Sequence, residues 1–207
     1  MNNIFILLIS LPFFVLGCSP NIVEDNKVTQ QIDSLYMNIF SKRGDKIYSI
    51  TSSSSSYDNT ELKFEFKNPT INIFNGEKTK YIITSDESTL SDNNKLLKLK
   101  GNVRLRTLTE DEDYLISDKF IWNIKENKYH LEGNIKFENK NIILNSGKAM
   151  LGRNNIIEFF SPVKYIIKDE DNQNKYEIKS ENAYYNLKTE SISFKGTDKR
   201  VRSIIYF

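Results

Sequence analysis

Residues 117–137 read SDKFIWNIKENKYHLEGNIKF, and this stretch decides the fold class. Apolar residues alternate with polar ones on both sides of a turn signal at Glu126–Asn127. Successive side chains of a β-strand point to opposite faces, so each half is predicted to be a strand with one dry and one wet face. Strands of this kind are typical of antiparallel sheets, and the stretch as a whole therefore predicts a β-hairpin.

The same hairpin pattern recurs along the chain. Its marker is a serine followed sixteen residues later by a glycine: Ser85 and Gly101, Ser117 and Gly133, Ser180 and Gly196. Weaker copies run from Ser52 to Asn68 and from Ser146 to Ser161. Stacked hairpins bury one continuous apolar interior that no single hairpin could form alone. Glycines inside strands, as at Gly101 and Gly133, predict a bulge or bend that curves the sheet.

The alternation also predicts which side chains face the interior. They are Phe64, Phe66, Leu97, Leu99, Val103, Leu105, Phe120, Trp122, Tyr129, Leu131, Ile135, Phe137, Val163 and Tyr165. The pattern is the same for a sealed core and for an open trough that holds a ligand, so both readings stay open at this point.

The composition excludes several classes of protein. The 29 basic and 27 acidic side chains give a net charge of +2, which argues against a nucleic-acid partner. The presence of only two alanines, Ala149 and Ala183, argues against a bundle of long helices. The sequence has one cysteine, Cys18, and one histidine, His130. These are too few for a cysteine- or histidine-rich metal site, and they argue against a catalytic triad. We therefore expect no enzymatic activity, no metal and no cofactor.

The N-terminal residues predict an export signal. Ile4–Leu16 is an apolar stretch with the length of a signal-peptide core, whereas a membrane-spanning helix needs about 20 apolar residues. It ends in VLGC at residues 15–18, which resembles the lipobox of bacterial lipoproteins and implies that Cys18 is lipidated. No lysine or arginine precedes the apolar run, and the alternative is an ordinary signal sequence followed by an unreactive cysteine.

One short amphipathic helix is predicted after the anchor. Residues 26–42 carry apolar side chains at helical spacing, and Gly44 is a suitable stop. The chain is thus divided into a lipoprotein-type signal peptide (1–17), an anchor segment with the helix (18–45) and a β domain (46–207).

The C-terminal residues predict an edge strand. The segment is apolar to its end, at Ile204, Ile205, Tyr206 and Phe207. Exposed edge strands are usually protected by charges or prolines. These four residues have neither, so the segment is expected to pair with another strand. The pairing is either internal or with a partner by strand addition.

The repeated motif resembles a known family. Residues 117–122 (SDKFIW) followed by 131–135 (LEGNI), and also 99–103 (LKGNV), are similar to the LptC/LptA group of lipopolysaccharide-transport proteins. The resemblance covers most of the chain from about residue 50. It implies an all-β fold, an open antiparallel β-jellyroll, whose apolar interior carries the acyl chains of lipopolysaccharide. Length and N-terminal attachment are more like LptC, although LptC commonly has a transmembrane helix in place of a lipid.

By this resemblance the protein is a periplasmic component of lipopolysaccharide export. It would accept lipopolysaccharide from the inner-membrane ABC transporter and pass it to an LptA-like bridge protein, while a lipid anchor holds it on the inner membrane. The alternative is a non-enzymatic envelope lipoprotein that acts as a structural or protein-binding β scaffold.

Overall fold

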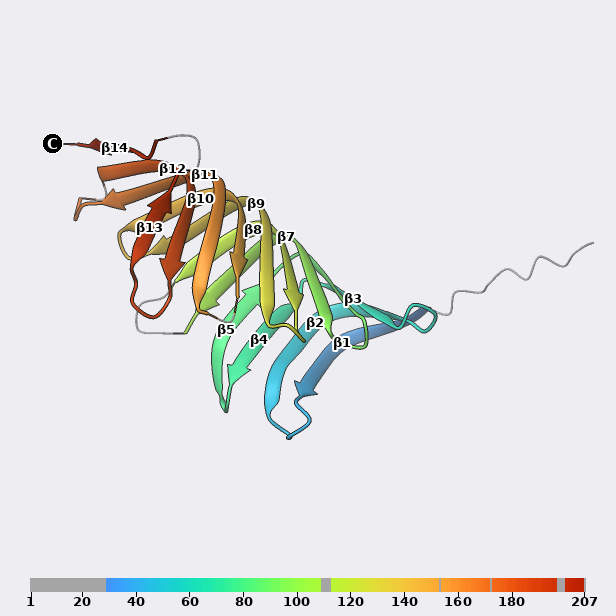
Figure 1. The fold of residues 1–207 in the computed structure, drawn as a ribbon. Coiled ribbons are helices and arrows are strands. Elements are labelled where there is room, and N and C mark those ends of the chain that lie inside the picture. The colour runs from blue at the N-terminus through green and yellow to red at the C-terminus, as the bar shows by residue number, and fades with distance from the viewer. Residues whose placement is uncertain (1–28, 109–112, 153, 172, 197–199, 207) are drawn as a thin grey trace, which may run out of the picture.

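The computed structural model describes residues 29–108, 113–152, 154–171, 173–196 and 200–206, and every regular element in these ranges is a β-strand. The strands are β1 (Thr29–Phe40), β2 (Lys46–Asp58), β3 (Lys63–Lys67), β4 (Thr70–Asn75), β5 (Lys78–Thr84), β6 (Glu87–Ser91), β7 (Leu96–Thr107), β8 (Tyr114–Asn123), β9 (Lys128–Asn139), β10 (Ile142–Leu151), β11 (Ile156–Lys168), β12 (Asn174–Asn186), β13 (Ile192–Lys195) and β14 (Arg202–Ile205). All pairings are antiparallel, and together they form one 14-stranded sheet (Figure 1). The all-β, antiparallel prediction is confirmed.

The sheet is folded over itself along its long strands. The first half of β7 pairs with β6, and its second half pairs with β5. In the same way β2 pairs with β4 through its first half and with β3 through its second half. We call the half of the sheet with β3, β6 and β13 leaf I, and the half with β4, β5 and β14 leaf II. Each long strand contributes to both leaves and bends where it passes from one to the other.

The repeated serines mark these bends. In each case the serine hydroxyl donates to the backbone carbonyl two residues ahead: Ser52 to Ser54 (2.6 Å), Ser85 to Glu87 (2.9 Å), Ser117 to Lys119 (3.1 Å), Ser146 to Lys148 (2.8 Å) and Ser180 to Asn182 (2.9 Å). The pairing register shifts at the same place, for example between Ile116 and Lys119. The sixteen-residue repeat of the sequence is therefore a repeat of strand corners.

The repeated glycines complete the corners. Gly133 has φ +75°, and a Cβ atom there would lie 2.3 Å from Oδ2 of Asp118. The next residue, Asn134, also has a positive φ and donates from Nδ2 to the same Asp118 oxygen at 2.9 Å. The equivalent set one hairpin earlier is Gly101, Asn102 and Asp86. The predicted bend at the two glycines is confirmed, since only glycine gives both the backbone angle and the space.

The predicted helix over residues 26–42 is wrong for the part that is described. Residues 29–40 form β1, which pairs with β2 from Thr29 to Phe40. Its inward side changes from Ile32 to Leu35 around Ser34, which has φ 54°. This change places apolar residues three apart, as in a helix, although the backbone is extended. Gly44, the predicted helix stop, instead lies in the β1–β2 turn with φ 90°.

The apolar core lies between the two leaves. It is built from inward residues of both, among them Ile50 and Ile83 of leaf II and Leu97 and Phe159 of leaf I, all fully buried. Strands β1 and β13/β14 lie at opposite ends of the sheet (Figure 1). No helix in the described part of the chain has the length and hydrophobicity that a membrane crossing requires.

Candidate functional site

The interior between the leaves is the candidate site. All the predicted inward residues lie in one hydrophobic cluster there, so the prediction of their orientation is confirmed. Most of them are buried, and Phe64 and Leu105 are partly buried. Their contact with a lipid remains a prediction.

Aromatic rings join the two leaves at three places along the interior. The pairs are Tyr48 with Trp122 (5.2 Å between ring centroids), Phe137 with Tyr185 (4.9 Å) and Tyr165 with Phe194 (5.2 Å). The first residue of each pair is in leaf II and the second in leaf I. Such pairs are worth about 0.5–1.5 kcal/mol beyond the area they bury. The leaves are thus held together by specific contacts far apart in the sequence.

A small apolar cavity lies between the first two of these contacts. Its lining includes Tyr81, Leu105, Leu115 and Phe137 from leaf II, and Phe120, Tyr129, Leu131, Leu151, Ile157 and Leu187 from the leaf I side. Its free volume is about 40 Å³. A cavity needs about 10–15 Å³ of such volume to hold one water molecule, so this one is far too small for an acyl chain unless the leaves part.

Two tyrosines of the interior hydrogen-bond through their hydroxyls to residues of hairpin turns. The Tyr48 hydroxyl, from leaf II, donates to the carbonyl of Asn94 in a leaf I turn at 3.5 Å. The Tyr129 hydroxyl donates to Oδ1 of Asn127 at 2.9 Å. Burial raises the pKa of both tyrosines above the usual range. Burial, with the nearby Asp113 and Glu190 carboxylates, raises the pKa of Tyr185 to about 12.

These raised pKa values predict a loss of stability in alkali. A tyrosine in the unfolded chain ionises near pH 10, whereas Tyr185 in the folded chain does so near pH 12. Its contribution is therefore complete below pH 10 and is lost as the pH rises to about 12. Denaturant midpoints measured across this window should fall with pH. Tyr185→Phe should reduce that fall, and Tyr206→Phe, at an exposed position, should not; equal slopes in both variants would contradict the prediction.

Sequence reasoning missed several lining residues. Tyr81 and Ile83 alternate with Lys80 and Ile82, so the pattern was present in β5 but was not extended to it. Leu115 was missed for a physical reason. In β8 the inward residues are odd-numbered up to the Ser117 corner and even-numbered after it. A two-residue period extended back from Phe120 therefore does not include Leu115.

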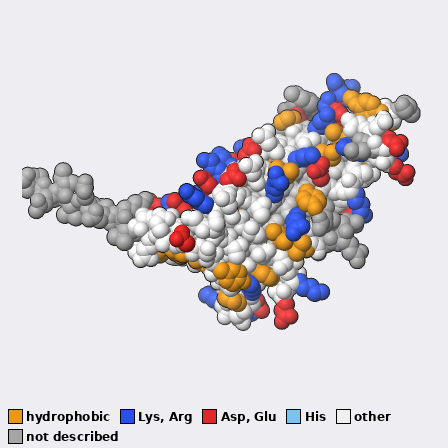
Figure 2. Space-filling model, turned by 180° about the vertical axis from the view of Figure 1, so that it is seen from behind, with side chains coloured by type: hydrophobic (Ala, Val, Ile, Leu, Met, Phe, Trp, Pro, Cys, Tyr) orange, Lys and Arg blue, Asp and Glu red, His pale blue; other side chains and the backbone are white. Residues whose placement is uncertain are grey.

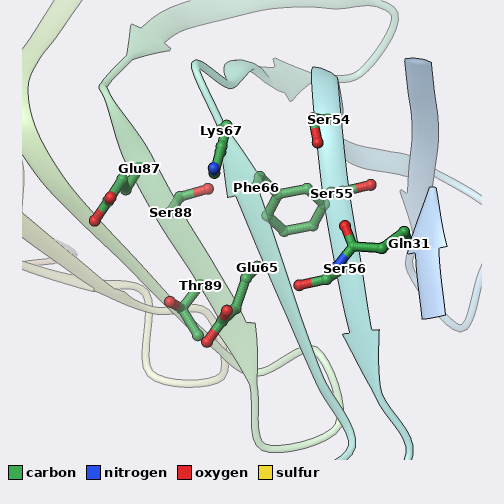
Figure 3. A pocket seen from close by; sticks show the side chains of 10 residues that line it. All are labelled: Gln31, Ser54, Ser55, Ser56, Glu65, Phe66, Lys67, Glu87, Ser88 and Thr89. Carbon is green, nitrogen blue, oxygen red and sulfur yellow. The ribbon is translucent and has the colours of Figure 1, made fainter. Parts of the chain in front are cut away.

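The exterior offers a weaker candidate. A hollow of about 350 Å³ crosses β1, β2, β3 and β6 (Figure 3). Its lining is mostly polar, with Glu65, Lys67 and Glu87 beside small hydroxyl side chains, and so it suits an acyl chain poorly. On the face shown in Figure 2, basic, acidic and hydrophobic side chains are mixed. This mixing agrees with the near-neutral net charge.

The C-terminal edge is paired internally. Ile204 and Ile205 lie in β14 opposite Glu177 and Tyr176 of β12, and the Tyr206 N–H donates to the carbonyl of Lys175 at 3.1 Å. The Lys179 and Lys164 ammonium groups beside Glu177 lower the pKa of its carboxyl. Among the described residues the other edge of β14 has no strand partner. Phe207, Cys18 and the predicted signal peptide lie outside the described residues.

The folded-over sheet and its apolar interior define a β-jellyroll protein. The chain belongs to the LptC family, since the family model described as "Lipopolysaccharide-assembly, LptC-related" matches residues 4–154. Family membership gives the chain a role in lipopolysaccharide transport. Among solved structures, the chain is similar to LptH, the LptA homologous periplasmic component of the lipopolysaccharide transport device from Pseudomonas aeruginosa. The two share 9% identity over 77% of this chain and 94% of that one, with a TM-score of 0.44. No curated protein matches the chain.

Proposed function

We propose that this protein is a periplasmic, non-catalytic carrier in the lipopolysaccharide export machinery. It accepts lipopolysaccharide from the inner-membrane ABC transporter and passes it along a bridge of β-jellyrolls toward the outer membrane. The observation that carries this proposal is the apolar interior of a chain that belongs to the LptC family.

The interior supplies what an acyl chain needs on its way through water. Each CH₂ group exposed to water costs about 0.8 kcal/mol, so a lipid with several chains requires continuous apolar cover. The inward residues of β7, β8 and β9, such as Leu99, Phe120 and Leu131, would provide that cover between the leaves. Because the closed interior has little free volume, lipid binding includes a separation of the leaves.

The two ends of the sheet suit a bridge. Strand β1 pairs with β2 alone, and β14 pairs with β12 alone, among the residues described. Each end can therefore accept a strand from another protein by edge-to-edge pairing. We assign the β14 end, with Ile204, Ile205, Tyr206 and Phe207, to an LptA-like bridge protein.

A lipid on Cys18 would hold the protein at the inner membrane. Lipidation at Cys18 leaves ten residues, 19–28, before β1 begins. An extended chain of that length reaches about 35 Å, which keeps the jellyroll close to the inner membrane. Mass spectrometry of the mature N-terminus would test this: a lipid-modified Cys18 is expected, and a free thiol there would contradict it.

Photocrosslinking in cells tests the carrier function. A photoreactive residue at Leu131, which is 3% exposed and faces the interior, should form an adduct with lipopolysaccharide. The same residue at Glu132, on the outer face beside Lys148, is the matched control and should not. Adducts at both positions, or at neither in a folded chain, would contradict the proposal.

A protein-binding scaffold is the second candidate. The free volume of only about 40 Å³ favours it, because a sealed core needs no more room. In that case a probe at Leu131 captures no lipid, while probes along β1 or β14 capture a protein.

A further inference from the structure

We propose that the β1–β2 hairpin ends in a membrane-contact site, which binds the surface of an anionic phospholipid bilayer. The proposal rests on the carrier function above, because that function places the protein at the inner membrane. We call the site the tip patch, and it consists of Tyr36 and Phe40 of β1, Lys42 and Arg43 of the following turn, Lys46 of β2 and Phe74 of β4. None of these residues belongs to the apolar interior.

The tip patch exposes two aromatic side chains. Tyr36 is 59% exposed and Phe40 is 56% exposed, the two largest fractions among the large apolar side chains of the described residues. The turn of this hairpin projects at the lower edge of the molecule (Figure 1), and Figure 2 shows hydrophobic side chains along that edge beside Lys and Arg. Single exposed apolar residues are common, but exposed aromatic rings beside basic residues are typical of surfaces that lie in the membrane interface.

Lys46 joins the aromatic side chains of the patch. Its Nζ donates to the Tyr36 hydroxyl at 3.3 Å and lies 4.4 Å from the centre of the Phe74 ring. Phe40 lies opposite Lys46 in the pairing of β1 with β2. A lysine whose stem lies along apolar groups while its ammonium stays in water suits a membrane surface, since the ammonium can meet a lipid phosphate while the rings lie below it.

The turn itself carries positive charge. Lys42 and Arg43 are exposed at its tip, and the one acid of the turn, Asp45, accepts a hydrogen bond from the Ser41 hydroxyl at 3.2 Å. An anionic membrane attracts Lys and Arg at its surface. The acidic run at 110–113 follows β7, which is three strands from β2 in the sheet. That separation is about 14 Å, which exceeds the screening length of about 8 Å in physiological salt.

The position of the patch agrees with the proposed anchor. The linker from Cys18 reaches β1 at Thr29, and the patch lies at the other end of the strand, around Phe40. The 12 residues of β1 extend about 40 Å, and the linker reaches about 35 Å. Both ends of β1 can therefore lie at one membrane surface. Because the other strands stack sideways from β1, this attachment points the β14 end away from the membrane (Figure 1).

Lipids brominated in their acyl chains test the contact, because bromine quenches a tryptophan that reaches the membrane interface. The mature chain carrying Phe40→Trp is reconstituted into vesicles of brominated phosphatidylethanolamine and phosphatidylglycerol. The wild-type chain, whose one tryptophan is the buried Trp122, gives the baseline. We expect quenching above this baseline for Phe40→Trp. The matched control is Tyr206→Trp, also at an exposed aromatic position but beside β14, which should stay at the baseline.

A charge variant tests the lipid preference without changing the rings. In the Phe40→Trp chain, Lys42→Gln with Arg43→Gln should lower the ratio of quenched to unquenched probe about tenfold or more. Vesicles without phosphatidylglycerol should have a similar effect. Lys188→Gln with Lys195→Gln removes the same charge from exposed positions near the opposite end of the sheet and should leave the ratio unchanged.

Flotation of the vesicles, measured on the same samples, separates the failures. A chain that floats while Phe40→Trp stays at the baseline overturns the membrane contact and leaves the tip patch to a protein partner. Quenching that is equal in Tyr206→Trp, or that does not respond to the loss of charge, also overturns it. A chain that does not float overturns the anchor together with the contact, whereas the carrier function is tested separately by the probe at Leu131.

Discussion

Replacement of Phe137 by alanine is expected to lower the free energy of unfolding by about 3–5 kcal/mol. Phe137 is 2% exposed and packs across the interior against Tyr185 and Phe159. Removing the ring takes away buried apolar area and leaves a cavity between two leaves that are each fixed by backbone pairing. Urea denaturation followed by circular dichroism measures the change.

A half-buried phenylalanine provides the control. Phe64 packs within leaf I, against Tyr57 at 4.4 Å and Phe66 at 5.9 Å. Because less of its area is buried and it spans no gap, Phe64→Ala should cost about half as much. A double-mutant cycle of Phe137→Ala with Tyr185→Ala should give a coupling energy of about 0.5–1.5 kcal/mol. Equal losses at both phenylalanines, or a coupling near zero, would mean that contacts between the leaves do not hold the interior closed.

The hairpins and their inward faces could be predicted because the signal is local. Leu131 and Phe137 face the interior as the two-residue period requires, and Gly133 marks the corner between them. The serine repeat was visible as spacing, but its cause was not. The hydrogen bond from Ser117 to the carbonyl of Lys119 is a matter of backbone geometry that residue types alone do not reveal.

The same local reasoning failed at β1 because one residue changed the period. Ser34, with φ 54°, moves the inward side from Ile32 to Leu35, and a spacing of three is typical of a helix. Long pairing with β2 stabilises the strand, and that partner cannot be read from β1 itself. Local propensity gives way to such tertiary contacts.

The state of the interior could not be predicted at all. Whether the leaves meet depends on contacts such as Tyr48 with Trp122, which are far apart in the sequence and leave no periodic trace. The alternation is identical for a sealed core and for an open trough. Only the packed arrangement gives the free volume, which is about 40 Å³ in the apolar cavity between the leaves.

The second large effect is expected at the corners. Gly133→Ala should lower the free energy of unfolding by about 2–4 kcal/mol, since alanine is strained at a positive φ and its Cβ meets Asp118. Gly76→Ala separates the two causes. Gly76 has φ +64° but no atom within 4 Å of the added Cβ, so its loss should be only about 1 kcal/mol. Thermal and urea unfolding of both variants measures the difference.

The contact with Asp118 can be tested directly by removing it. In an Asp118→Gly background neither the carboxylate nor the Cβ of residue 118 occupies the space of the new Cβ, and Gly133→Ala should then cost about as much as Gly76→Ala. An undiminished loss would show that the backbone angle alone requires glycine at the corner. The expected recovery would instead assign the corner to the close approach of Asp118 and Gly133, with Asn134 fixing the carboxylate. Since Gly101 and Asp86 repeat this contact on the neighbouring hairpin, Gly101→Ala should show the same dependence on Asp86.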